Sequence, residues 1–288
     1  MQQKGFGTFW HGSGLGPLER ACLSSFVRAN QSLQLFSYEP NQVCPPKGVM
    51  LRNANDVLPL TDLLKQVLTK HPARFSDLFR LKMMQVENLI WVDCDVYFLR
   101  PVTCNPEIVT IGRQLRDGTR YCWNGVIYLE PSSNLFADYL ELLTTSRIEY
   151  RENWDTNIDI KGEDKSARNF FLKNRNINFH SENLPRNFFG PVLLSLLVLD
   201  HKEVKLTPSH VHYPYGAPKL RKNILDPQSY SLSPPKNSET IHFYGSMVRQ
   251  VCARYWAQSR SFKQDLPQGS LLAQALSGRL GPVSGQYP

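Results

Sequence analysis

The sequence contains no hydrophobic run long enough to cross a membrane. A spanning helix needs about 20 apolar residues, and the best run, VLLSLLVL at 192–199, has the length of a core strand or helix. The N-terminal segment MQQKGFGTFWHGSG also lacks the apolar centre of a secretion signal. We therefore expect a cytoplasmic protein, with a peripheral position at the inner face of a membrane left open. A luminal domain of a longer, anchored protein is the alternative.

Paired cysteine motifs and internal repeats are also lacking. The chain has 6 cysteines, and none of them form a Cys-x-x-Cys pair or a zinc-binding spacing. A chain of 288 residues is too long to depend on disulfides for its stability. We expect reduced thiols scattered through the core, as is usual in the cytosol.

The composition is that of a folded protein with a basic surplus. Apolar residues make up 41%, charged residues 20% and aromatic residues 11%, which excludes a largely disordered chain. Lys and Arg number 33 against 25 Asp and Glu, a net charge of +8. A positive surface favours anionic partners such as nucleotides, phosphorylated lipids, anionic glycans or nucleic acid. Nucleic acid is not expected, because no RNA-binding signature or helix-turn-helix pattern accompanies the basic residues.

Hydrophobic periodicity predicts alternating helices and strands. Segments with helical spacing lie at 18–29, 57–70, 73–87 and 134–145. Segments typical of strands lie at 32–38, 49–52, 89–92, 125–130 and 241–244, and the aromatic segment 6–12 indicates a first short strand that runs into a glycine-rich turn. The strand at 89–92 is apolar on both faces, as in a covered central strand. The alternation predicts an α/β fold with a mainly parallel central sheet flanked by helices.

The remaining segments suggest one large domain and a tail. A polar, mixed-charge stretch predicts a polar or helical insertion near 146–187, and 210–218 is typical of a loop. The segment 188–200 returns to a core composition. We expect one domain over 1–266 and an exposed C-terminal tail over 267–288 that carries a short helix.

Two carboxylates, Asp93 and Asp95, directly follow the buried strand at 89–92. Side chains at i and i+2 project to the same side of an extended chain, and α/β sheets bind ligands beyond the carboxyl ends of their strands. Two hard oxygen ligands suit Mg²⁺ or Mn²⁺ holding a diphosphate. A bare Asp-x-Asp also occurs in solvated turns. The apolar residues on both sides favour the metal site here, because buried carboxylates need a partner.

The segments FSDLFR (75–80) and LIWVDCDVYFLRP (89–101) resemble the core of DXD-containing retaining glycosyltransferases of the GT-A fold. The most similar families include yeast mannosyltransferases, α-1,4-galactosyltransferases, bacterial capsule and lipopolysaccharide transferases, and large clostridial glucosylating toxins. FWHG (9–12) and LQLFSYEP (33–40) also resemble this group, so the similarity covers roughly residues 5–130 best. It implies a GT-A-like nucleotide-diphospho-sugar transferase fold.

The resemblance implies metal ligands on two segments. Asp95 would bind the metal directly, and Asp93 would bind it through water or contact the ribose. His242, in IHFYGSM, resembles a third ligand of related transferases, and imidazole is a reasonable ligand for manganese. A purely structural histidine is the alternative. The metal, Mn²⁺ or Mg²⁺, would neutralise the diphosphate leaving group.

The resemblance also implies the catalytic residues Asp77, Arg80 and Asn124. Asp77 and Arg80 share one helix face, where Asp77 would accept from sugar hydroxyls and Arg80 would reach a phosphate or the sugar. Asn124 would lie near the donor sugar. An ordinary surface pair is the alternative for the first two. Glu163 and Asp164, on the polar stretch, are weaker candidates for contacting the acceptor.

Five further residues are expected around the nucleotide sugar. Trp10 and Tyr38 would frame the nucleobase beside His11, although plain core aromatics and a surface histidine are the alternatives. Gly190 matches a Gly-Pro pair that opens a helix facing the donor or acceptor, and Gly245 belongs to a diphosphate loop after His242.

Together the residues and the resemblance predict a metal-dependent retaining glycosyltransferase. It would move a hexose from a nucleotide diphosphate sugar, expected to be UDP-linked, to a saccharide or glycolipid acceptor in surface polysaccharide synthesis. Retention is implied by the resemblance alone, because no residue can be named as a nucleophile. The alternatives are an effector that glycosylates protein, a nucleotidyltransferase, and a basic nucleic-acid-binding module. Peripheral contact with an anionic membrane surface is open.

Overall fold

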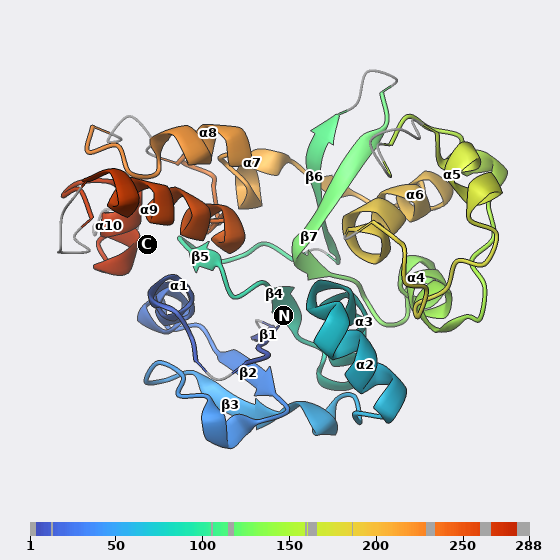
Figure 1. Ribbon diagram of the computed structural model, residues 1–288, viewed down its shortest axis with the longest axis horizontal. Helices are drawn as coiled ribbons and strands as arrows, with labels where there is room; N and C mark the ends of the chain where they lie inside the picture. The colour runs from blue at the N-terminus through green and yellow to red at the C-terminus, as the bar shows by residue number, and fades with distance from the viewer. Residues whose placement is uncertain are drawn as a thin grey trace.

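The structure is a computed structural model, shown in Figure 1. It describes residues 4–12, 14–104, 106–114, 118–158, 160, 166–185, 187–228, 234–259 and 266–280. The described chain forms a mixed α/β fold built around a central sheet. Within these residues no helix combines the length and the apolar character that crossing a bilayer requires.

The central sheet has 7 strands in the order β3-β2-β1-β4-β7-β6-β8. Its strands are β1 (Phe6–Phe9), β2 (Leu33–Ser37), β3 (Met50–Asn53), β4 (Ile90–Val92), β6 (Ile108–Gln114), β7 (Arg120–Tyr128) and β8 (Leu206–Thr207). All neighbours pair in parallel except β7, which runs antiparallel to both β4 and β6. The predicted mainly parallel sheet is therefore confirmed. A separate antiparallel pair joins β5 (Val96–Phe98) to β9 (Thr240–His242).

Helices flank the sheet. They are α1 (Pro17–Arg28), α2 (Asp62–Lys70), α3 (Pro72–Glu87), α4 (Asn134–Thr144), α5 (Ala167–Lys173), α6 (Leu193–Asp200), α7 (Ser209–His212), α8 (Ala217–Asn223), α9 (Gly245–Ser259) and α10 (Leu271–Leu276). Shorter turns of helix are η1 (Pro40–Gln42), η2 (Ala54–Asp56), η3 (Glu152–Trp154) and η4 (Phe188–Val192), the last a π-helix. In Figure 1, α4, α5 and α6 gather beside β6 and β7, whereas α8, α9 and α10 lie at the opposite end with α1 and β5.

Strand β4 lies in the main core, between β1 and β7. Its three residues are at most 2% exposed, which fits their apolar character on both faces. Helix α3 packs Phe75 and Phe79 against Phe9 of β1, with ring centroids 5.5 and 4.6 Å apart. This packing fixes α3 beside the carboxyl end of β1. Asp77 and Arg80, on a different side of the helix from the two phenylalanines, contact Asn124 of β7.

A second, smaller core lies between α1 and the C-terminal helices. Leu271, Leu272 and Ala275 of α10 are at most 2% exposed in it. The C-terminal tail expected to be exposed over 267–288 is thus packed into the molecule over α10, because one apolar side of this short helix faces α1. Residues 281–288 lie outside the described part of the chain.

Several elements differ from the expectations. The helix expected over 57–70 begins only at Asp62, because Thr61 caps it and Pro59 interrupts the preceding segment. The segment 210–218, expected to be a loop, contains most of α7 and the start of α8. Strand β7 starts at Arg120, before the expected 125–130, because it also pairs with β6. The polar stretch near 146–187 carries η3 and α5 in its described part.

Candidate active site

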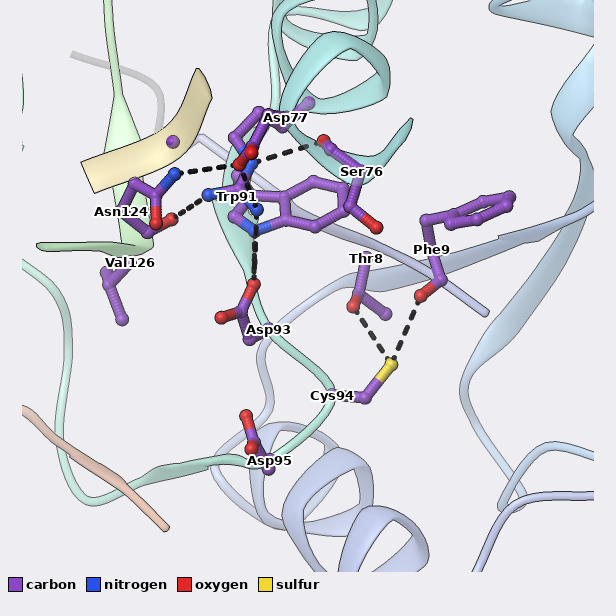
Figure 2. Close-up of polar contacts among 12 residues, drawn as sticks. Thr8, Phe9, Ser76, Asp77, Trp91, Asp93, Cys94, Asp95, Asn124 and Val126 are labelled. Carbon is purple, nitrogen blue, oxygen red and sulfur yellow. Dashed lines mark hydrogen bonds and ion pairs between the residues drawn. The ribbon is translucent and has the colours of Figure 1, made fainter. Parts of the chain in front are cut away.

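The aspartate pair lies in a tight turn between β4 and β5. The backbone N–H of Val96 donates to the carbonyl of Asp93 at 3.0 Å, which closes the turn. The spacing had suggested that the two carboxylates lie on an extended chain. The structure shows a hydrogen-bonded turn instead. Figure 2 shows the Cys94 side chain between them directed toward Thr8 and Phe9, away from Asp93. The turn, rather than strand alternation, leaves both carboxylates on the same side.

His242 completes a cluster with the two aspartates. Its Nε2 lies 3.4 Å from Asp93 Oδ2 and 3.2 Å from Asp95 Oδ1. One ligand atom from each of the three residues falls within 4.8 Å of the others. The pairing of β5 with β9 places Val96 opposite His242, and so brings the histidine to the turn. The predicted metal ligands thus lie together in the fold.

The charges in this cluster stabilise one another. Burial by itself would raise the pKa of Asp95, but the His242 imidazolium and the backbone N–H of Gly245 hold it below its usual range. For His242 the directions are reversed. Burial by itself would lower its pKa, but the carboxylates of Asp95 and Asp93 raise it above the usual range. Two carboxylates and an imidazole form a donor set that fits Mn²⁺ or Mg²⁺.

The backbone beside the cluster is shaped for close approach. A Cβ atom at Gly125 would lie 2.8 Å from Asp93 Oδ2 and 3.1 Å from His242 Nε2. The backbone N–H of Asp93 also donates to the carbonyl of Gly125 at 2.7 Å. Any side chain at position 125 would therefore enter the space between the carboxylate and the imidazole.

A second polar cluster lies in the middle of β7 and on α3. Asn124 Nδ2 donates to Asp77 Oδ1 at 3.0 Å, and Arg80 Nη2 lies 3.2 Å from the same oxygen. The side chains of Asp77 and Arg80 are only 6% and 5% exposed. Burial raises the pKa of Asp77 to about 6, although Arg80 and Asn124 act in the opposite direction. The predicted catalytic residues are therefore a buried, hydrogen-bonded group rather than a surface pair.

Arg80 connects the two clusters. Its Nη1 donates to the carbonyl of Asn124 at 2.5 Å, and its Nη2 lies 3.7 Å from Asp93 Oδ1. The guanidinium also lies over the Trp91 indole, 4.8 Å from the ring centroid. The Trp91 Nε1–H donates to Asp93 Oδ1 at 2.8 Å (Figure 2). One cation thus spans the space between the Asp77–Asn124 pair and the Asp93–Asp95–His242 cluster.

Both clusters open into one cavity of about 540 Å³. Most of the predicted site residues line it, namely Trp10, His11, Asp77, Arg80, Asp93, Asp95, Asn124, His242 and Gly245. Tyr38 and Gly190 are not among the lining residues. The Tyr38 hydroxyl donates to the carbonyl of Leu58 at 2.6 Å, and its ring packs on Phe9. A Cβ at Gly190 would lie 2.6 Å from Asn124 Nδ2 and from Asp77 Oδ1, so Gly190 lies behind that pair.

Other lining residues carried little or no sequence signal. Arg249 was not among the predicted site residues, and its Nη1 lies 2.7 Å from Glu19 Oε1. Glu19 is a buried acid in the first turn of α1, and nothing in its local sequence marks it. Trp123 and Tyr244 each adjoin a predicted site residue, and that adjacency was the available signal. Glu163 and Asp164 lie outside the described residues.

Comparisons with known proteins give a distant likeness. No protein-family model matches the chain, and no curated protein matches it. Among solved structures, the chain is similar to one titled "PaToxG Glycosyltransferase", with 10% sequence identity and a TM-score of 0.39. The match covers 97% of this chain and 88% of that chain.

Proposed function

We propose that the chain is a metal-dependent glycosyltransferase with a GT-A-like fold that uses a nucleotide diphosphate sugar. The observation that carries this proposal is the shared cavity in which Arg80 joins the Asp93–Asp95–His242 cluster to the Asp77–Asn124 pair. Metal-type ligands suit a diphosphate, and buried carboxylate and amide groups suit sugar hydroxyls. A hexose donor linked to UDP, a saccharide acceptor and retention of configuration follow the sequence resemblance.

The metal cluster and α9 would hold the diphosphate. Asp93, Asp95 and His242 would bind Mn²⁺ or Mg²⁺, and the bound cation would neutralise the charge that develops on the leaving diphosphate. Helix α9 begins at Gly245 on the cavity wall, where its N-terminal dipole favours negative charge. Arg249, one turn later, lines the same wall. These positive groups support a diphosphate at this position.

The buried cluster would orient the donor sugar. Asp77 accepts hydrogen bonds, while Arg80 and Asn124 donate them, so the three groups together match the donors and acceptors of sugar hydroxyls. Their burial strengthens each contact because little water competes. Trp10 follows β1, on the other side of β4 from β7 and Asn124. Within the described part of the chain its buried indole nitrogen has no hydrogen-bond partner, and an acceptor atom of a nucleobase placed against it would satisfy this donor.

Donor hydrolysis tests the proposed function. UDP-glucose, UDP-galactose, UDP-N-acetylglucosamine and GDP-mannose are incubated with the protein and Mn²⁺, and the released nucleoside diphosphate is measured. At least one donor should be hydrolysed, and Asp95→Ala should lower that rate by about 100-fold or more. Asp56→Ala, which removes an exposed carboxylate from η2, is the matched control.

Four outcomes would reject the proposal. Full activity of Asp95→Ala or indifference to a chelator contradicts the metal role. Release of pyrophosphate instead of nucleoside diphosphate indicates nucleotidyl transfer. No hydrolysis of any donor, together with salt-sensitive binding of DNA or RNA, indicates a nucleic-acid-binding module.

A further inference from the structure

The donor site proposed above leaves three aromatic residues of the cavity wall unassigned. Trp123 on β7, Tyr213 after α7 and Tyr244 before α9 all contribute to its wall. The Trp123 ring centroid lies 6.1 Å from that of Tyr213 and 6.3 Å from that of Tyr244. We call these three residues the aromatic shelf. Because they come from segments far apart in the sequence, the fold alone assembles the shelf.

The Trp123 indole is held in place but remains accessible. Tyr121 packs against it edge-on, with the ring centroids 5.1 Å apart. Across the strand pair, the indole lies over Gly112 of β6, so close that a Cβ atom there would overlap the indole ring. Trp123 nevertheless remains only partly buried and faces the cavity. A fixed, partly open aromatic ring is a preorganised binding surface.

The aromatic shelf lies on the metal side of β7. The Trp123 ring packs against Tyr213 and Tyr244, and both of these rings also contact the His242 ring, whereas the Asn124 side chain donates to Asp77. Gly125 is the residue that backs Asp93 and His242. The Tyr244 ring meets the His242 ring edge-on, with centroids 4.4 Å apart. The shelf is therefore adjacent to the metal cluster, and it lines the same cavity as Asp77 and Asn124.

The sheet order separates the shelf from the expected nucleobase position. Trp10 follows β1, the aspartate turn follows β4, and Trp123 lies on β7. Strands β1, β4 and β7 are consecutive neighbours in the sheet. A donor that extends from Trp10 to the metal cluster would leave the aromatic shelf free for a second substrate on the far side.

We propose that the aromatic shelf binds a pyranose ring of the saccharide acceptor, an inference that rests on the proposed function of the adjacent donor site. The C–H face of a pyranose packs on aromatic faces, while its hydroxyls stay at the edges for polar contacts. In the transfer, the acceptor oxygen bonds to the anomeric carbon of the donor and the bond from that carbon to the diphosphate breaks. The hydroxyl proton passes to the departing diphosphate.

Binding of simple glycosides tests the aromatic shelf directly. Methyl glycosides of glucose, galactose and mannose are mixed with the protein, Mg²⁺ and UDP, and saturation-transfer NMR reports the ring protons that contact the protein. At least one glycoside should receive saturation. Trp123→Leu should weaken its binding by about tenfold, the size of an aromatic packing contribution, and Trp123→Phe should have a smaller effect. Tyr150→Leu, at a partly buried tyrosine in a separate cavity, is the matched control.

A variant at Gly112 tests whether the position of the Trp123 ring matters, because it leaves the ring itself unchanged. Gly112→Ala keeps the Trp123 indole but pushes it from its place, so it should also weaken glycoside binding. Thermal unfolding of each variant checks that the fold is retained, and Trp123→Phe decides the question if Trp123→Leu does not fold. The inference is overturned if no glycoside receives saturation from the wild type, or if the folded Trp123 and Gly112 variants bind like the wild type.

Rates distinguish a failure of the shelf from a failure of the proposed function. Donor hydrolysis and glycoside-stimulated release of nucleoside diphosphate are measured on the same preparations. Trp123→Leu should lower the stimulated rate about tenfold more than the hydrolysis rate. If glycosides bind but no donor is hydrolysed, the proposed saccharide binding at the aromatic shelf stands and the proposed donor chemistry is rejected. If the protein hydrolyses a donor and transfers the sugar to a protein acceptor, and Trp123→Leu changes neither rate, the donor chemistry stands. Saccharide binding at the aromatic shelf is then rejected.

Discussion

The Asp95 carboxylate accepts the backbone N–H of Gly245 at 2.6 Å, which ties the turn after β4 to the first residue of α9. The two residues are 150 positions apart in the sequence. The same region brings in His242, because β9 pairs with β5 immediately beyond the turn. An amide at a helix N-terminus stabilises a carboxylate in its ionised form. Closure of the metal cluster is therefore coupled to docking of the C-terminal part of the chain.

A methyl group at position 125 should disturb the metal cluster without removing a ligand. In Gly125→Ala the new Cβ would lie 2.8 Å from Asp93 Oδ2, so the carboxylate and His242 must move apart. We expect Mn²⁺ affinity to fall by about tenfold or more, with a loss of about 1–3 kcal/mol in unfolding free energy. Isothermal titration with Mn²⁺ measures the affinity. Gly14→Ala, where the methyl meets open space, is the control; equal affinities would contradict the proposed ligand geometry.

Removing Arg80 should leave a buried carboxylate without its charge partner. Arg80→Met is expected to cost about 3–5 kcal/mol in unfolding free energy, because Asp77 then stays buried and unpaired. The double variant with Asp77→Asn should recover part of that loss, since the uncompensated charge is gone. Urea unfolding of both variants gives the coupling energy.

The partly exposed ion pair between Arg52 and Glu87 provides the comparison for Arg80. Arg52 lies 3.2 Å from Glu87, and their side chains are 31% and 20% exposed. Arg52→Met should cost about 1 kcal/mol or less, because solvent screens such pairs. A loss of similar size in Arg80→Met would mean that the Asp77–Arg80 pair is solvated in solution.

Cys94 should hold the aspartate turn in position against β1. Its Sγ lies 3.2 Å from Thr8 Oγ1 and 3.5 Å from the carbonyl of Phe9, so it fixes the turn to β1 (Figure 2). Cys94→Ser keeps a donor and should retain Mn²⁺ affinity within about twofold, whereas Cys94→Ala should lose about threefold to tenfold. Cys104→Ala, away from the cavity, is the control. If Cys94→Ala binds Mn²⁺ as tightly as Cys94→Ser, the metal cluster does not depend on the contact of this side chain with β1.

Stability should fall in acid because of His212. This side chain is fully buried on α7 beside Glu239 and Thr240, and burial lowers its pKa to about 3. Below the unfolded-state pKa of about 6.5 the unfolded chain gains a proton that the folded chain refuses. The contribution of neutral His212 is therefore complete above pH 6.5 and is lost progressively toward pH 3.

The His212 contribution can be isolated by substitution. Between pH 7 and pH 5 the loss from this one residue is about 2 kcal/mol, since each pH unit below 6.5 is worth about 1.4 kcal/mol. His212→Gln should reduce the pH dependence of unfolding free energy by that amount, measured by urea unfolding at the two pH values. His11→Gln, at an exposed position, serves as the comparison. An unchanged pH dependence in His212→Gln would show that His212 is protonated in the folded chain.

Local patterning was sufficient for the elements that carry their own signal. The spacing of apolar residues predicted α3 and the buried strand β4, and therefore also that Asp93 and Asp95 follow a strand at the sheet edge. Helical periodicity placed Asp77 and Arg80 on one face, because positions three apart are neighbours on any helix. The same reasoning failed for the turn at Asp93–Asp95, where a hydrogen-bonded turn replaces extended backbone.

The sequence by itself determined which chemistry is present: carboxylates after an apolar strand, a charged pair on one helix face, and a histidine in a late strand. Only the tertiary structure decided that His242 meets the two aspartates, that Trp123, Tyr213 and Tyr244 share one wall, and that Tyr38 lies outside the cavity. The physical reason is that periodicity sets the direction of a side chain relative to its own element. Which elements become neighbours depends on strand pairing and helix docking between distant segments, and local sequence does not encode these contacts.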